Sequence, residues 1–154
     1  MKTMSLNQEL IQKAVARFQS GFNCTQSVIS TLYEHMNPRK KSELIPKIGS
    51  GFGGGIGLCG SVCGSLTGSI MAVGIKYGSN ESGEDNNAKA YAKSWELFKR
   101  FEKQHGSVIC RELIKYDLSK PEQIAKAREE NVFEKLCAKF VATAIEDYLE
   151  IEKE

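Results

Sequence analysis

The stretch GSGFGGGIGLCGSVCGSLTG, residues 49–68, decides how the rest of the chain can pack. Eleven of the fourteen glycines lie in residues 49–78, together with two of the five cysteines. Glycine is costly to order and is a poor helix former, so this concentration needs a structural reason. Glycines recur every four residues at Gly60, Gly64 and Gly68. This spacing predicts a helix with one nearly side-chain-free face, against which another helix can pack closely.

The same segment has the length of a membrane span, because residues 55–75 contain no charge over 21 positions. Six of these residues are glycine and four are serine or threonine, so the segment is only weakly apolar. Aromatic belts and a strong basic asymmetry, which favour insertion, are also lacking on its flanks. We therefore expect a buried helix and no membrane insertion.

The flanking sequence has apolar residues at helical spacing. A capping box at Ser5–Gln8 predicts the first helix, and a second box at Asn23–Gln26 predicts a helix to about Met36. Further helices are expected from Ser42, over 88–105 with Tyr91, Trp95 and Phe101 on the apolar stripe, over 107–114, from Ser119, and over 133–149. No run alternates as a strand does. The predicted fold class is all-α, a single bundle-like domain over residues 1–154 with a central, buried, glycine-rich helix.

Composition excludes several classes of function. The net charge of +2 gives no reason to expect nucleic acid as a partner. The N-terminal residues lack the apolar run of a signal peptide, so we expect a cytoplasmic protein, where structural disulfides are rare. The pattern Gly55-x-Gly57-x-x-Gly60 matches a dinucleotide-binding fingerprint, but no strand precedes it, which argues against that function. Five cysteines then point to metal binding, redox chemistry or core packing.

Two cysteines are expected on the glycine-rich helix. Cys59 and Cys63 are four residues apart, so on a helix they would face the same way. That spacing suits joint binding of a soft metal or a pair of redox partners. It equally suits two small buried apolar residues, and the spacing alone favours neither interpretation.

The positions of the remaining cysteines differ in what they predict. Cys24 and Cys110 are each expected in the first turn of a helix, where free backbone N–H groups favour a thiolate. Arg111 beside Cys110 adds to that effect. Cys137 lies on the apolar face of the final helix and is expected there as a core residue. His35 and His105 are expected at the surface, without the ligand spacing of a catalytic zinc site.

The order of these motifs resembles a known family. The resemblance rests on these segments, in chain order: Phe22-Asn23-Cys24-Thr25-Gln26, Gly51-Phe52-Gly53-Gly54-Gly55, Cys63-Gly64-Ser65-Leu66-Thr67-Gly68, Cys110 and Cys137. In them the chain resembles the C-GCAxxG-C-C family, whose members are described as redox-active. The central motif departs from the family name, which spells Gly-Cys-Ala, and Cys59 is an additional cysteine. The resemblance covers nearly the whole chain.

The resemblance implies that Cys24, Cys63, Cys110 and Cys137 are the site cysteines, and our first hypothesis is that they converge as a thiol redox centre. The helix-start positions of Cys24 and Cys110 predict that one of these two is the low-pKa attacking thiolate. Such a protein needs an electron donor, either a partner redox protein or a small thiol. The alternative is a metal-binding protein, in which Cys24, Cys59, Cys63, Cys110 and Cys137 supply ligands to zinc or an iron–sulfur cluster. A third hypothesis is a non-catalytic interaction module with the cysteines in its core.

Overall fold

The computed structural model describes residues 4–154, and every regular element in this range is helical. The α-helices are α1 (Leu6–Gln19), α2 (Cys24–Met36), α3 (Leu44–Gly49), α4 (Gly64–Tyr77), α5 (Ala88–His105), α6 (Cys110–Ile114), α7 (Pro121–Glu129) and α8 (Ala138–Glu152). Short 3-10 turns cover Ser50–Phe52 and Glu84–Asn87, and a π-helical turn covers Phe133–Cys137. The predicted all-α class is confirmed.

Both predicted capping boxes are present. Ser5 Oγ accepts a hydrogen bond from the Gln8 amide at 3.3 Å, and Gln8 Oε1 accepts one from the Ser5 amide at 3.1 Å. At the start of α2, the Gln26 amide donates to Asn23 Oδ1 at 2.8 Å, and the Asn23 amide donates to Gln26 Oε1 at 3.1 Å. These reciprocal bonds satisfy amides that the helix itself leaves free. They make Cys24 the first residue of α2.

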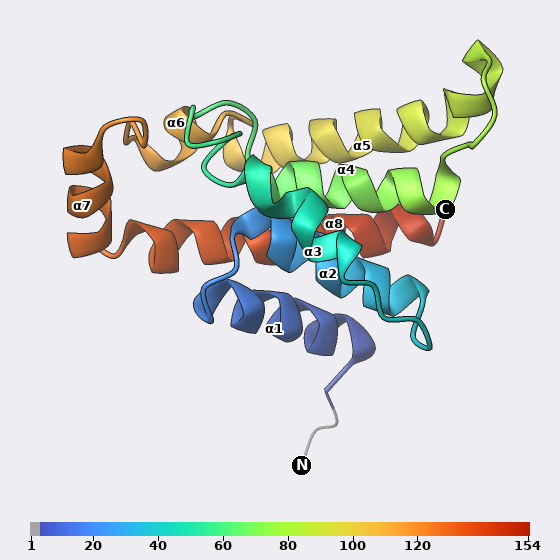
Figure 1. Ribbon diagram of the computed structural model, residues 1–154, viewed down its shortest axis with the longest axis horizontal. Helices are drawn as coiled ribbons and strands as arrows, with labels where there is room; N and C mark the ends of the chain where they lie inside the picture. The colour runs from blue at the N-terminus through green and yellow to red at the C-terminus, as the bar shows by residue number, and fades with distance from the viewer. Residues whose placement is uncertain (1–3) are drawn as a thin grey trace.

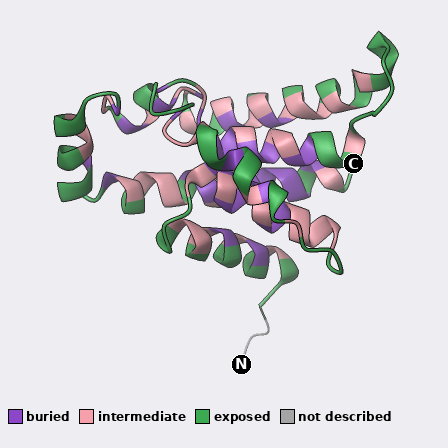
Figure 2. Cartoon of the chain, in the orientation of Figure 1, coloured by how far each residue is buried: buried purple, intermediate pink, exposed green. Residues whose placement is uncertain are grey.

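The core lies where α2, α4 and α8 meet, as the buried residues in Figure 2 show. A β-carbon at Gly68 would lie 2.9 Å from the carbonyl oxygen of Thr25 and 3.0 Å from Val28 Cβ, both on α2. The backbones of α2 and α4 therefore approach so closely that only glycine fits there. The expected glycine contact face is present in the first half of α4, at Gly64 and Gly68.

The helix expected from Gly55 begins only at Gly64, so that prediction is wrong for its first half. Residues 53–63, which we call the glycine loop, are irregular. Five consecutive residues of this loop have φ angles between 54° and 70°: Gly54, Gly55, Ile56, Gly57 and Leu58. A right-handed helix needs negative φ, so this run cannot join α4. Gly60, with φ 74°, also lies in the loop and is not part of a helical face.

The predicted inward face of α5 is also partly wrong. Tyr91 and Trp95 are among the most exposed large side chains, at 69% and 66% of their full area. Leu97 and Phe101 are the buried residues of this helix. The reason is that α5 packs on α4 and α8 through the face bearing Leu97, which is rotated from the one bearing Tyr91 and Trp95.

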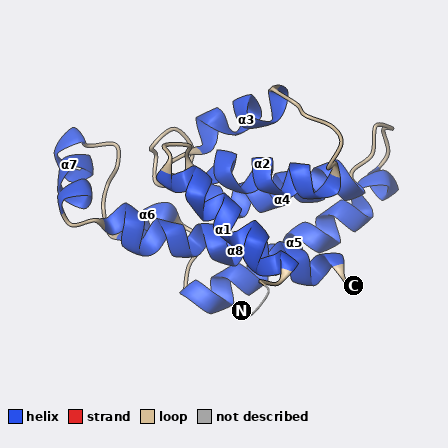
Figure 3. Cartoon of the chain, turned by 90° about the horizontal axis from the view of Figure 1, so that it is seen from below, coloured by secondary structure: helices blue, strands red, loops and turns tan. Residues whose placement is uncertain are grey.

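One end of the molecule is built from short elements. Figures 1 and 3 show α7 standing beyond α6 at this end, where the chain turns back into α8. The glycine loop lies beside α6 here. None of the helices in residues 4–154 combines the length and apolarity that a bilayer crossing requires.

Candidate functional site

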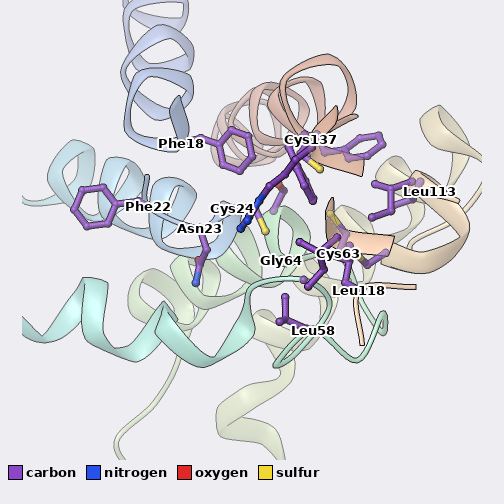
Figure 4. A pocket seen from close by; sticks show the side chains of 18 of the residues that line it. Phe18, Phe22, Asn23, Cys24, Leu58, Cys63, Gly64, Leu113, Leu118 and Cys137 are labelled. Carbon is purple, nitrogen blue, oxygen red and sulfur yellow. The ribbon is translucent and has the colours of Figure 1, made fainter. Parts of the chain in front are cut away.

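Four cysteines line a single cavity of about 410 Å³ at this end of the molecule. Cys24 opens α2, Cys63 immediately precedes α4, Cys110 opens α6, and Cys137 ends the π-helical turn before α8. All four are free thiols. Figure 4 shows Cys24, Cys63 and Cys137 around the same space. The chain thus brings together cysteines that are up to 113 positions apart, as 137 − 24 = 113.

The fifth cysteine is not part of this group. Cys59 is exposed in the glycine loop and does not line the cavity. Its Sγ makes one weak contact, at 3.9 Å, with the carbonyl oxygen of Gly57. The expected shared helical face of Cys59 and Cys63 is wrong, because no helix connects them. A ligand set that includes Cys59 would need the loop to rearrange.

The left-handed run of the glycine loop explains part of the glycine content. A β-carbon at Gly55 would lie 2.5 Å from the Ser61 amide nitrogen and 2.8 Å from Cys110 Cβ. Gly55 also has φ 70°, which disfavours any other residue. The loop brings Gly54 and Leu58 to the cavity wall. Leu58 adopts φ 66° without glycine's freedom, so the loop carries backbone strain next to the cysteines.

Backbone hydrogen bonds join the end of the loop to the start of α6. The Cys110 amide donates to the Ser61 carbonyl at 2.7 Å, and the Cys63 amide donates to the Val108 carbonyl at 2.8 Å. Val62 and Ile109 form an isolated antiparallel bridge between the same segments. These bonds fix Cys63 and Cys110 relative to each other, although the two residues are 47 positions apart in the chain.

Burial controls the acidity of Cys24. It raises the pKa of this thiol, while hydrogen bonds from the Gly54 and Thr25 amides favour the thiolate and oppose the rise. The position at the start of α2 agrees with the sequence-based prediction. The predicted lowering of the Cys24 pKa is not found. Burial raises this pKa by more than the amide groups at the helix start lower it.

The other three thiols have raised pKa values because they are buried and because negative charge on Cys24 lies nearby. Burial raises the pKa of Cys63 to about 12 and that of Cys110 to about 11, and negative charge on Cys24 adds to both. Arg111 opposes the rise at Cys110. Burial also raises the pKa of Cys137, followed by charge on Cys24, Cys63 and Cys110. Ionised Cys24 thus acts on each of the other three thiols.

The rest of the cavity wall is mainly apolar. Figure 4 shows Phe18 on one side, with Leu58 and Leu118 on the other. Arg128 of α7 is the one charged residue among those that line the cavity, and no acidic residue lines it. Sequence analysis missed Arg128, because a single arginine on a short helix has no motif around it.

The described residues 4–154 contain no group of three or more His, Cys, Asp or Glu side chains placed to hold a metal ion. Thiolates are suitable ligands for zinc and iron–sulfur clusters, so the residue types fit such a centre. Their arrangement does not, and we derive no chemistry through a metal.

Comparison with known proteins identifies the family. A family model described as "Putative redox-active protein (C_GCAxxG_C_C)" matches residues 22–151. Neither the curated proteins nor the solved structures include a significant match. The matched range contains all four cavity cysteines and the glycine loop. With most of its length matched, the chain belongs to the C_GCAxxG_C_C family.

Proposed function

We propose that this protein is a thiol redox protein whose cavity cysteines exchange with a disulfide substrate. The observation that carries the proposal is the meeting of Cys24, Cys63, Cys110 and Cys137, from four separate segments, in one cavity. The redox description of the family supports it. Cysteines that serve only as small apolar core residues have no need to share a cavity wall.

Cys24 is the proposed attacking residue. Negative charge on Cys24 raises the pKa of the other three thiols, and we propose that Cys24 is the first of the four to lose its proton. Backbone amides, those of Gly54 and Thr25 among them, favour its thiolate by hydrogen bonding. Cys63 is the proposed resolving residue, because the Cys24 sulfur lies against Gly64, the next residue along the chain.

The exchange consumes one substrate disulfide for each protein disulfide formed. The Cys24 thiolate attacks one substrate sulfur, the substrate S–S bond breaks, and the other substrate sulfur leaves as a thiolate. Cys63 then gives up its proton and attacks Cys24 Sγ, which releases the second substrate thiolate and leaves a Cys24–Cys63 disulfide. Two electrons pass from the protein to the substrate, and the two substrate thiolates take up the protons of Cys24 and Cys63.

The reduced state is then restored by a second dithiol. We assign Cys110 and Cys137, which line the same cavity, as a second pair able to reduce the first by the same exchange. A partner redox protein or a small thiol supplies the electrons for a further cycle. The reducing cytoplasm is the proposed compartment, because it keeps thiols reduced.

The test is reaction of the reduced protein with dithiodipyridine, a neutral aromatic disulfide. In the double variant Cys110→Ser, Cys137→Ser, which lacks the second pair, we expect two thiopyridone molecules to be released for each protein disulfide, with Cys24 joined to Cys63 in the peptide map. Adding Cys63→Ser to this double variant should stop the reaction at the mixed disulfide on Cys24, with release of one thiopyridone from this pair. Reaction confined to Cys59, or an unchanged product pattern in Cys24→Ser, would overturn the proposal. Cys59→Ser is the matched control and should keep the two-thiopyridone reaction.

A further inference from the structure

The wall of the cavity carries a single charged side chain beside its four cysteines. Of the nineteen residues that line it, Arg128 is the one with a charged side chain, and most of the others are apolar. Four phenylalanines contribute to the wall: Phe18, Phe22, Phe133 and Phe140. The volume of about 410 Å³ is in the range of small-molecule sites. The wall therefore suits an apolar ligand, with a place for one negative charge.

Arg128 has no acidic partner within the described part of the chain. Arg17, Arg100 and Arg111 each form an ion pair with a carboxylate, whereas no ion pair involves Arg128 among residues 4–154. Its neighbour Glu130 is hydrogen bonded to Tyr116 instead. Arg128 lines the cavity and is also exposed, so it lies at the cavity mouth. Its guanidinium group can therefore meet an anion that enters from solvent.

The helix ends at the cavity wall also favour an anion. The N-termini of α2 and α4, helices of 13 and 14 residues, both face the cavity through Cys24 and Gly64. Helix N-termini carry partial positive charge. Ser65 also belongs to the wall, and its buried Oγ has no hydrogen-bond partner in the protein. A buried hydroxyl group without a partner is costly, so Ser65 is an unsatisfied polar group beside the cavity.

We propose that the cavity binds a small molecule with an apolar body and one anionic group, with Arg128 pairing with the anion at the mouth. If the proposed thiol exchange is correct, the substrate is a small disulfide of this chemical class. The apolar body lies against the phenylalanines and leucines, and the anion directs the ligand so that its other end reaches the cysteines. A carboxylate, sulfonate or phosphate would serve equally as the anion.

The test separates binding from redox chemistry. Two fluorescent probes share one aromatic body: anilinonaphthalene sulfonate carries a single anion, and N-phenylnaphthylamine is neutral. We expect Arg128→Gln to weaken binding of the sulfonate about fivefold, as loss of a partly exposed ion pair does, with little change for the neutral probe. The bound sulfonate should also protect Cys24 from alkylation by iodoacetamide.

Lys126→Gln is the matched control, because Lys126 lies on the same helix, is exposed and does not line the cavity. It should bind both probes as the unchanged protein does. Equal losses in Arg128→Gln and Lys126→Gln, equal losses for the two probes, or binding without protection of Cys24 would overturn the inference. The exchange with neutral dithiodipyridine is measured separately in the same variants. A negative result with the anionic probe would therefore overturn the proposed ligand and leave the proposed redox function intact. A negative result with dithiodipyridine would overturn the redox function and leave the ligand proposal intact.

Discussion

The sulfur of Cys24 lies in the space that a β-carbon on Gly64 would occupy. Such a carbon would lie 2.3 Å from Cys24 Sγ and 2.5 Å from Thr25 Oγ1. Contacts this short do not occur between unbonded atoms, so residue 64 must lack a side chain for Cys24 to keep its position. The glycine at the start of α4 and the cysteine at the start of α2 are therefore parts of one arrangement.

Gly64→Ala should destabilise the protein. Alanine is the better helix former by about 1 kcal/mol, but forcing a methyl group into a tight core costs about 1–3 kcal/mol. With contacts as short as those at Gly64, we expect the packing cost to exceed the gain, and denaturant unfolding measures the difference. Gly74→Ala is the matched control on the same helix, because a β-carbon there meets nothing within 4 Å. It should be stabilising, and equal stability of the two variants would contradict the packing argument.

Cys59 should be the first cysteine to react with an alkylating reagent. It is exposed, whereas Cys63 and Cys110 retain 5% and 8% of their exposed area. We expect Cys59 to be labelled more than about tenfold faster than Cys63 in the native protein, since a buried thiol must wait for local opening. Peptide mass spectrometry over time measures the rates. Labelling in denaturant should remove the difference, and a native Cys63 rate equal to that of Cys59 would contradict the burial of the cavity.

Replacing Cys24 should make Cys110 more acidic. Burial and negative charge on Cys24 both raise the pKa of Cys110, to about 11, and Cys24→Ser removes the charge. The alkylation rate of Cys110 should then rise at a lower pH than in the unchanged protein. The pH profile of iodoacetamide labelling, followed at the Cys110 peptide, measures this shift. Cys59→Ser should leave the profile in place, and an unshifted profile in Cys24→Ser would show that the two sulfurs do not interact.

A buried carboxyl on α8 should make stability depend on pH. Burial raises the pKa of Asp147 above its usual 3.8, although the Gln104 side chain donates a hydrogen bond to it at 2.7 Å. The folded state therefore binds a proton more tightly than the unfolded chain. The stability that this proton provides is complete below the unfolded pKa and is lost as pH rises through the folded pKa.

Asp147→Asn removes this titration. We expect the stability of the variant, measured relative to the unchanged protein, to increase as pH rises from about 4 to about 7. Urea unfolding at several pH values measures the difference between the two proteins, so titration of all other groups cancels. A difference that stays constant with pH, or that shrinks, would contradict the raised pKa.

Local signals in the sequence predicted the starts of the first two helices correctly. Capping boxes at Ser5 and Asn23 depend on side chains within three residues, and both are present. They also placed Cys24 at a helix start. The apolar stripe of the last helix is likewise buried, from Phe140 to Leu149. Such features follow from neighbours along the chain, which a sequence displays directly.

The irregular conformation of the glycine loop could not be predicted from neighbouring residues in the sequence. A repeat of small residues every four positions is compatible with a helix, and Gly64 and Gly68 do lie on helix α4. Glycine also permits positive φ, and the spacing of Gly60 from Gly64 does not distinguish the two conformations. At Gly55 the loop conformation depends on close contacts with Ser61, which lies past a turn, and with Cys110, which is distant in the sequence. Neither contact can be read from the glycine spacing. Arg128 was missed for a related reason, since its importance comes from the cavity it borders.

Because Cys24 packs against the start of α4, the stability of the fold and the redox potential of a Cys24–Cys63 disulfide are linked. A Cys24–Cys63 disulfide would tie together two helices that the reduced protein already holds in contact, so it would constrain the unfolded chain far more than the native one. The oxidised protein should then be harder to unfold than the reduced protein. By thermodynamic linkage, whatever stability the disulfide adds to the fold also makes the disulfide harder to reduce. A mutation that loosens α2 from α4 would therefore turn the protein into a stronger oxidant without touching any cysteine.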